Sequence, residues 1–344
     1  MEGKEFLVKL SNSVAISGYE NNLHPILKEY FKNYVDEIKY GTLGDFIGIK
    51  KGKGGLKIMI AAHMDEVGLM VTNINERGFV EFRSIIGVDS KILPAQEVII
   101  HGKKEVYGVV GAKPPHVLTN EELKKAIDTD DMLIDTGLKR EVLMDLVSPG
   151  DLISIKRDAS NLLGDFITGK ALDDRAGICA MFECAKILKN TEHYADVYFV
   201  GTVMEEAGLR GARTVANIIN PDIGIAIDVT SADKYAKDDI QVECGKNIKI
   251  AVGPNIHPEL VEKLIKTADK NDIPFKIVAE PGRTGTDAWA IQVSGEGVAT
   301  LLISIPIKYM HTSTEVINYS DVEKAGKLIA SFIASLKDWG DIYA

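Results

Sequence analysis

The spacing of apolar residues divides the chain into stretches of different character. Near the N-terminus apolar residues recur every three or four positions, which predicts helical structure within residues 1–34. These residues are Leu23, Ile26, Leu27 and Phe31. Two strand-like runs follow at 46–50 and 57–62, and the second is almost wholly apolar. A run of this kind is typical of a buried strand in a parallel sheet.

From about residue 67 to 164 the pattern changes to short β-branched segments separated by glycines. The segments are 68–72, 78–83, 97–101, 106–111 and 151–155. A polar stretch at 120–145 is expected to be partly helical. Short strands bounded by turn residues predict a small β-rich domain, inserted at residues 67–164.

After residue 169 strands and helices alternate. Strands are predicted at 195–203, 223–228 and 248–252, and helices at 175–189, 258–270 and 321–337. This alternation predicts an α/β fold with a mostly parallel, mixed sheet flanked by helices. The insert splits this domain in sequence, so that it consists of residues 1–66 and 165–344.

Composition narrows the class of protein. Hydrophobic residues make up 45% of the 344 and charged residues 26%, which is typical of a folded enzyme large enough for two domains. The formal net charge of -10 disfavours nucleic acid and anionic membranes as partners. Three cysteines without a Cys-x-x-Cys spacing speak against a disulfide framework and favour a cytoplasmic location. No run approaches the ~18 apolar residues of a membrane span, and the N-terminus lacks the apolar core of a signal peptide.

Five short segments place His, Asp or Glu at the end of a predicted strand or at the head of a helix, where open α/β sheets form their sites. They contain His63 and Asp65, Asp173 and Asp174, Glu205 and Glu206, Asp228, and His311. Each segment alone has an ordinary interpretation, as a turn, a helix cap, a solvated acid or a structural histidine.

Together the segments supply two imidazoles and three carboxylates that suit a pair of divalent cations with one carboxylate shared. The proposed ligands are His63, Asp173, Glu206, Asp228 and His311. Mixed nitrogen and oxygen ligation favours Zn²⁺, Co²⁺ or Mn²⁺ over Ca²⁺. Glu205 remains as an acid that would move protons between water and a leaving amine. Asp65 would orient the ring of His63 through its second nitrogen.

The sequence resembles the M42 family of metallo-aminopeptidases, the tetrahedral and glutamyl-aminopeptidase group. The matching segments are Ala-His-Met-Asp-Glu-Val-Gly (62–68), Ala-Leu-Asp-Asp-Arg-Ala-Gly (171–177), Glu-Glu-Ala-Gly-Leu-Arg-Gly-Ala (205–212), Ala-Ile-Asp (226–228), Pro-Gly-Arg-Thr-Gly-Thr-Asp-Ala (281–288) and Met-His-Thr-Ser (310–313). They occur in the family's order, without a departure at the ligand positions.

The resemblance implies a role for each site residue. Asp173 bridges two metal ions, His63 and Asp228 complete the ligands of one ion, and Glu206 and His311 complete those of the other. Glu205 is the general base, and Asp65 and Asp174 lie behind the ligands. Similar peptidases also have a cis peptide bond after the bridging aspartate, here between Asp173 and Asp174.

The resemblance further implies an aminopeptidase that acts on peptides. The insert at 67–164 would be a dimerisation domain, and dimers would assemble into a tetrahedral dodecamer. Two alternatives stay open: a related co-catalytic deacylase or carboxypeptidase, and a non-catalytic assembly protein on the same fold. A glycosidase is disfavoured because the carboxylates serve better as metal ligands. The preferred N-terminal residue is also open, although Arg210, Arg213 and Arg283 would suit an acidic side chain.

Overall fold

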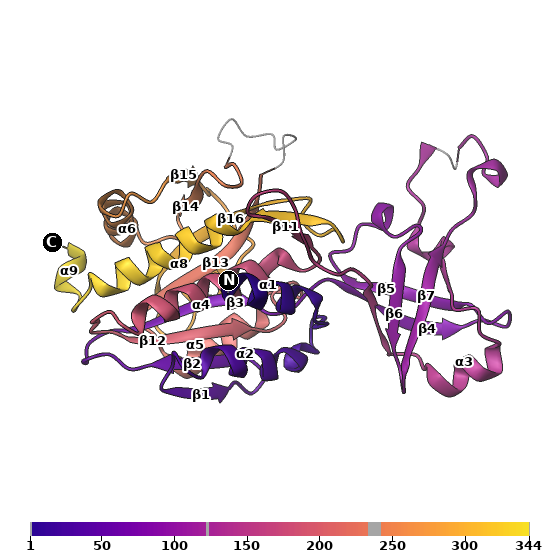
Figure 1. Ribbon diagram of the computed structural model, residues 1–344, viewed down its shortest axis with the longest axis horizontal. Helices are drawn as coiled ribbons and strands as arrows, with labels where there is room; N and C mark the ends of the chain where they lie inside the picture. Colours follow the sequence, from indigo (N-terminus) through magenta and orange to yellow (C-terminus); the bar gives the residue numbers. More distant parts are fainter. Residues whose placement is uncertain (1, 122–123, 233–241, 344) are drawn as a thin grey trace.

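The structure, a computed structural model, describes residues 2–121, 124–232 and 242–343. Figure 1 shows two parts, a larger body of helices and strands and a smaller group of strands to its right. The larger part contains a mixed sheet flanked by helices and the smaller part is a closed β-barrel, so the predicted fold class is confirmed.

The large sheet has a parallel centre with antiparallel strands at its margins. Its order is β1-β2-β12-β3-β13-β16-β17-β11-β10, with β14 and β15 attached beside β16. The central strands are β12 (Asp196–Thr202), β3 (Lys57–His63), β13 (Ile223–Ser231) and β16 (Ala299–Lys308), and each runs parallel to the next. The others are β1 (Glu37–Tyr40), β2 (Phe46–Lys50), β10 (Ser160–Asn161), β11 (Phe166–Gly169), β14 (Ile248–Val252), β15 (Phe275–Ala279) and β17 (Glu315–Asn318). β3 is buried from Ile58 to His63, as its apolar sequence predicts.

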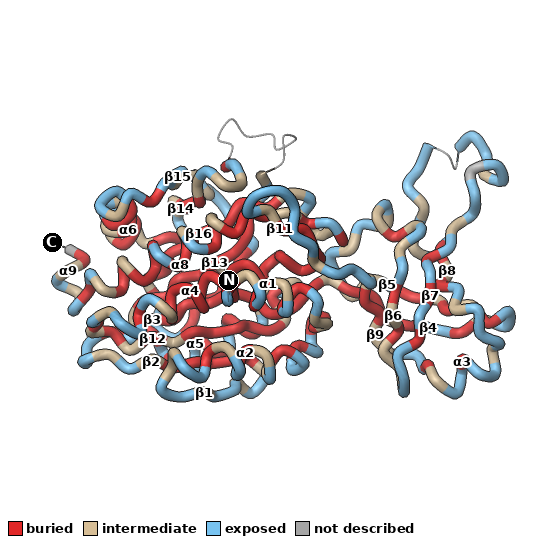
Figure 2. The backbone as a smooth tube through the Cα atoms, in the orientation of Figure 1, coloured by how far each residue is buried: buried red, intermediate tan, exposed pale blue. Residues whose placement is uncertain are grey.

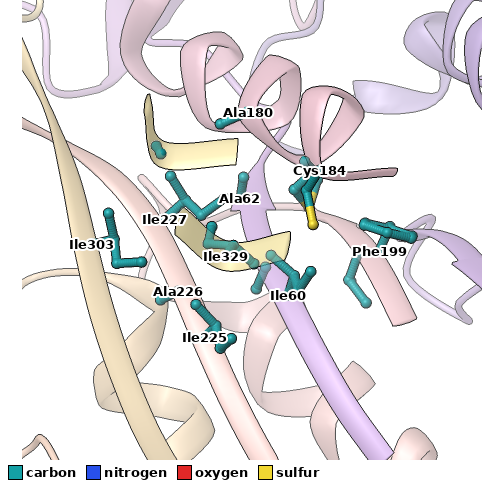
Figure 3. Packing of buried hydrophobic residues seen from close by; sticks show 14 of the residues in the cluster. Ile60, Ala62, Ala180, Cys184, Phe199, Ile225, Ala226, Ile227, Ile303 and Ile329 are labelled. Atoms are coloured by element: carbon teal, nitrogen blue, oxygen red, sulfur yellow. The ribbon is translucent and has the colours of Figure 1, made fainter. Parts of the chain in front are cut away.

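Helices cover both faces of this sheet. One layer contains α1 (Glu2–Asn12), α2 (His24–Phe31), α4 (Leu172–Leu188) and α8 (Tyr319–Ala334), which contact one another. The other contains α5 (Arg210–Ile219) and α7 (Asp287–Gln292), while α6 (Pro258–Lys270) packs on α8 and α9 (Gly340–Tyr343). Figure 3 shows apolar side chains of the core between sheet and helices, among them Ile227 and Ile303 on strands and Ala180 and Ile329 on helices.

The barrel is built from residues of the predicted insert. Its closed order is β4-β5-β8-β7-β6-β9. The strands are β4 (Gly68–Ile74), β5 (Val80–Ile86), β6 (Glu97–His101), β7 (Glu105–Gly111), β8 (Leu133–Asp135) and β9 (Leu152–Ile155), and α3 (Arg140–Leu146) lies between β8 and β9. Buried and exposed residues alternate along β7, and the barrel has its own apolar core. Figure 2 shows this buried interior separate from that of the larger part.

Some local details differ from the sequence prediction. The helical structure predicted within residues 1–34 consists of two helices and a 3-10 turn, and the segment from Ser13 to Tyr19 is not helical. The helix predicted from Arg175 begins at Leu172, but Asp173 and Asp174 within it have non-helical backbone angles. The peptide bond between these two aspartates is cis, as expected. Among the described helices, none combines the length and apolar character needed to span a membrane.

Candidate metal centre

Six predicted site residues line one pocket at the carboxyl edge of the parallel strands, and we call them the metal cluster. They are His63, Asp173, Glu205, Glu206, Asp228 and His311. His63 ends β3, the two glutamates follow β12, and Asp228 lies in β13. Because these strands are parallel, their carboxyl ends meet at one edge of the sheet, and residues more than 100 positions apart come together.

Asp173 lies at the centre of the metal cluster. One of its carboxylate oxygens, Oδ1, is 3.1 Å from Nε2 of His63, and the other, Oδ2, is 3.1 Å from Nε2 of His311. Nε2 of His311 is also 3.1 Å from Oε1 of Glu206. Asp173 therefore lies between the two histidines, with one oxygen directed to each.

Two groups of side chains bring their potential ligand atoms within 4.8 Å of one another: His63 with Asp173 and Glu206, and His63 with Asp174 and Asp228. The second group contains Asp174, which the sequence placed behind the ligands. Both oxygens of Asp174 accept backbone hydrogen bonds, Oδ1 from Gly177 at 3.0 Å and Oδ2 from His63 at 3.3 Å. These bonds are consistent with a supporting position for Asp174.

Asp65 is fully buried behind the metal cluster and supports more of it than the sequence suggested. Nδ1 of His63 is 3.1 Å from the backbone carbonyl oxygen of Asp65 and 3.4 Å from its Oδ1. Oδ1 also accepts a hydrogen bond from the Glu205 backbone N–H at 3.0 Å, and Oδ2 accepts one from Glu206 at 3.2 Å and one from the Ser17 hydroxyl at 2.6 Å. One carboxylate therefore positions the histidine and both glutamates.

The charges of the metal cluster fit divalent cations. Burial, together with neighbouring carboxylates, raises the pKa of Glu205 to about 10. Burial, followed by the charge of Asp173, raises the pKa of Asp228 to about 8. Hydrogen bonds with Asp173 and a neighbouring glutamate raise the pKa of His311 to about 11. Oε1 of Glu205 is also buried without a hydrogen-bond partner among the described residues. Enclosed carboxylates beside two imidazoles form a donor set that Zn²⁺, Co²⁺ or Mn²⁺ would satisfy.

Sequence reasoning missed Glu315, which joins two ligand segments. Its Oε2 accepts hydrogen bonds from the backbone N–H groups of Leu172 at 2.7 Å and Asp173 at 3.2 Å, and its Oε1 accepts one from His311 at 2.8 Å. His311 needs this support because it has a left-handed backbone, with φ of 59°. The only signal in the sequence was an acid four positions after a candidate ligand.

A second buried group, which we call the ion cluster, lies beside the metal cluster and consists of Glu66, Lys170 and Arg175. The Lys170 ammonium is 2.6 Å from Oε2 of Glu66, and the Arg175 guanidinium is 3.5 Å from Oε1. Arg175 also donates hydrogen bonds to the backbone carbonyls of Met64 at 3.0 Å and Ser13 at 3.1 Å. This cluster connects the N-terminal segment, the end of β3 and the head of α4.

Comparison with known proteins identifies the family. A family model described as M42 glutamyl aminopeptidase matches residues 44–328. The chain belongs to the M42 family. A relative, the lysyl aminopeptidase of Pyrococcus furiosus, is 38% identical over 339 residues, which cover 97% of this chain and 97% of the relative.

Solved structures agree with the M42 assignment. The TET aminopeptidase of Thaumarchaeota archaeon SCGC AB-539-E09 is similar with a TM-score of 0.94 and 31% identity, covering 100% of this chain and 99% of that one. The TET1 peptidase of Pyrococcus horikoshii, which can assemble into a tetrahedron or a large octahedral shell, has a TM-score of 0.86 and 34% identity, covering 97% and 100%. These similarities support an aminopeptidase function for this M42 chain.

Proposed function

We propose that the chain is a metallo-aminopeptidase that uses two divalent ions to hydrolyse the bond after the N-terminal residue of peptides. The main support is Asp173, whose two oxygens each lie 3.1 Å from Nε2 of a different histidine. Asp173 would be shared by the two ions, His63 and Asp228 would complete one set of ligands, and Glu206 and His311 would complete the other. The ions would be Zn²⁺ or Co²⁺, with Mn²⁺ also suited to these donors.

Glu205 is the proposed general base. When bound, two divalent ions would polarise the scissile carbonyl and lower the pKa of the attacking water. Glu205 lines the pocket, and its buried Oε1 has no hydrogen-bond partner among the described residues, which supports a role in accepting a proton from water. The same carboxyl group then donates the proton to the nitrogen of the leaving amine. Asp65 is a positioning residue, since it fixes the backbone of Glu205.

Metal removal tests this proposal. Dialysis against a strong chelator should abolish hydrolysis of aminoacyl p-nitroanilides, and Zn²⁺, Co²⁺ or Mn²⁺ should restore it. Elemental analysis before and after dialysis should show the loss of two ions per chain. Full activity in a sample verified to contain no metal would contradict the proposal.

An assay with a peptide and its N-acetylated form separates the competing functions. An aminopeptidase cleaves a peptide with a free N-terminus and leaves its N-acetylated form intact. A carboxypeptidase would cleave both, whereas a deacylase would release acetate from the blocked form. A non-catalytic assembly protein would cleave neither after loading with metal.

We also propose that residues 67–164 form a dimerisation domain attached to a catalytic domain of residues 1–66 and 165–344. The barrel has its own core and exposes Tyr107 and Val109 on the outer face of β7. The assembly of the similar Pyrococcus horikoshii peptidase supports dimers that form a tetrahedral dodecamer. Light scattering should give a mass of two or twelve chains, and a monomer at micromolar concentration would contradict this proposal. The cytoplasmic location stays a prediction.

A further inference from the structure

The pocket that contains the metal cluster has a second end, which no catalytic role explains. Its volume is about 330 Å³. Away from the metal cluster it is lined by Lys249, Glu280, Thr284, Leu302 and Ser304. A peptide whose first residue lies at the metal cluster would place that residue's side chain in this part of the pocket.

Strand pairing places Lys249 at a defined distance from the metal cluster. Asp228 of β13 is opposite Ser304 of β16, and Ser304 is opposite Lys249 of β14. Residues paired in this way project from the same face of a sheet, and neighbouring strands are about 4.8 Å apart. The Cα atoms of Asp228 and Lys249 are therefore separated by two strand spacings, about 10 Å. One amino-acid side chain fits between the metal cluster and Lys249.

Lys249 forms an ion pair with Glu280, the residue that follows β15. The Lys249 ammonium contacts Oε1 of Glu280, and the two side chains are 9% and 25% exposed. Among the described residues that line the pocket, Lys249 is the only lysine or arginine, and Glu280 is the only carboxylate outside the metal cluster. This end of the pocket therefore carries two opposite charges that cancel.

We infer that the Lys249–Glu280 pair makes the enzyme prefer an uncharged N-terminal side chain over glutamate or lysine. This inference rests on the proposed aminopeptidase function. A charged side chain would lose its water and meet a like charge from one member of the pair, and it could contact the opposite charge only by separating Lys249 from Glu280. An uncharged side chain avoids that cost and contacts Leu302 and Met310, which also line the pocket. The pair thus sets specificity by excluding both signs of charge.

The arginines considered from the sequence do not contribute to this pocket. None of Arg210, Arg213 and Arg283 is among its lining residues. Arg210 donates a hydrogen bond to the carbonyl of Ala207, and the Arg283 guanidinium lies 5.6 Å from the ring centre of Trp289. The expectation that these arginines would bind an acidic side chain has no support in the pocket.

Two substitutions that each leave one charge uncompensated test the inference. Glu280→Gln keeps the shape of the side chain and leaves the Lys249 cation, so activity on Glu-p-nitroanilide should rise relative to Leu-p-nitroanilide. Lys249→Met leaves the Glu280 carboxylate, so activity on Lys-p-nitroanilide should rise instead. We expect the ratios of kcat/KM to change at least tenfold, in opposite directions, from a wild type that prefers leucine at least tenfold. The double variant should return to the leucine preference.

Calorimetric titration with free leucine, glutamate and lysine provides a readout that does not need turnover, and the affinities should follow the same order. If the metal-loaded wild type cleaves none of the three substrates, the proposed function fails. If the wild type is active but prefers glutamate or lysine, or if Glu280→Gln keeps the wild-type ratios, the inference about the ion pair is wrong. Glu280→Gln decides this even if Lys249→Met does not fold, because Glu280 is partly exposed and glutamine retains its size.

Discussion

The metal cluster and the ion cluster both contain buried carboxylates, but their charge is balanced in different ways. Burial raises the pKa of Glu66, yet the charges of Lys170 and Arg175 bring it below its usual value. Glu205 and Asp228 are buried to a similar degree, and their pKa values are raised to about 10 and about 8. Burial alone therefore does not determine the charge of these carboxylates. The difference lies in which cations the chain itself supplies.

The contrast separates residues that are adjacent in the sequence. Asp65 and Glu66 are neighbours, as are Asp174 and Arg175, but in each pair one residue supports the metal cluster and the other belongs to the ion cluster. Lys170 and Arg175 both form ion pairs with Glu66, so these two nearby cations do not balance the carboxylates of the metal cluster. The remaining carboxylates have only imidazoles beside them, which suits ligands for cations from solution.

Removing a cation from the ion cluster should have the largest effect on stability. Arg175→Met removes one of the two cations beside Glu66 and the hydrogen bonds from the guanidinium to the carbonyls of Met64, Leu10 and Ser13, so we expect a loss of about 3–5 kcal/mol in the free energy of unfolding. Urea denaturation of the two proteins measures it.

The matched control is Arg83→Met, because Arg83 pairs with Asp130 on the surface, where the side chains are 67% and 56% exposed. That substitution should cost about 1 kcal/mol or less. Equal losses in the two variants would show that the ion cluster is not a balanced buried group.

Removing the carboxyl group of Glu205 should affect catalysis and leave the fold intact. Glu205→Gln keeps the shape but removes the base, so kcat should fall at least ~10²-fold while two metal ions stay bound. Steady-state kinetics and elemental analysis of the same sample measure both quantities.

Glu206→Gln is the comparison, since Glu206 contacts His311 and is a proposed ligand. It should lower metal occupancy as well as activity. The division of roles within the metal cluster is wrong if Glu205→Gln turns over normally, or if it loses metal while Glu206→Gln retains it.

The smallest effect is expected from Ser17→Ala, which removes one hydrogen bond to Asp65. Asp65 keeps its bonds to the backbone of Glu205 and Glu206, so the metal cluster should stay assembled. Substitution of a group that supports a metal ligand typically lowers metal affinity or activity about 10–100-fold, and we expect the lower end of that range. Metal titration monitored by activity measures this effect, and an unchanged affinity would show that the serine does not tune the site.

The sequence predicted the central fold well where local pattern and tertiary structure agree. The apolar run of β3 and the glycine-separated strands of the barrel are clear in the sequence because burial determines their composition. It also indicated the residues of the metal cluster, since each follows a predicted strand or begins a helix. The roles given to those residues stay predictions.

Other features could not be predicted from the sequence because they depend on pairing between distant segments. Glu66 and Lys170 are 104 positions apart, and nothing local shows that they meet. Glu315 lies among serines and threonines, where an acid usually indicates a solvated turn. The Lys249–Glu280 pair depends on β14 joining β16 through only two paired positions. Such contacts follow from sheet register, which the sequence pattern does not specify for short strands.

The positions of Glu66 and Lys170 have a mechanical consequence. Glu66 lies two residues before β4, where the chain enters the barrel, and Lys170 directly follows β11, the second strand of the large sheet after the barrel. Their contact ties the outgoing and returning connections together within a few residues of His63 and Asp173. A force applied to the barrel would be transmitted to the larger part of the molecule at this junction. If barrels pair between copies, the orientation of one copy relative to the other then depends on this junction, which lies next to the metal cluster.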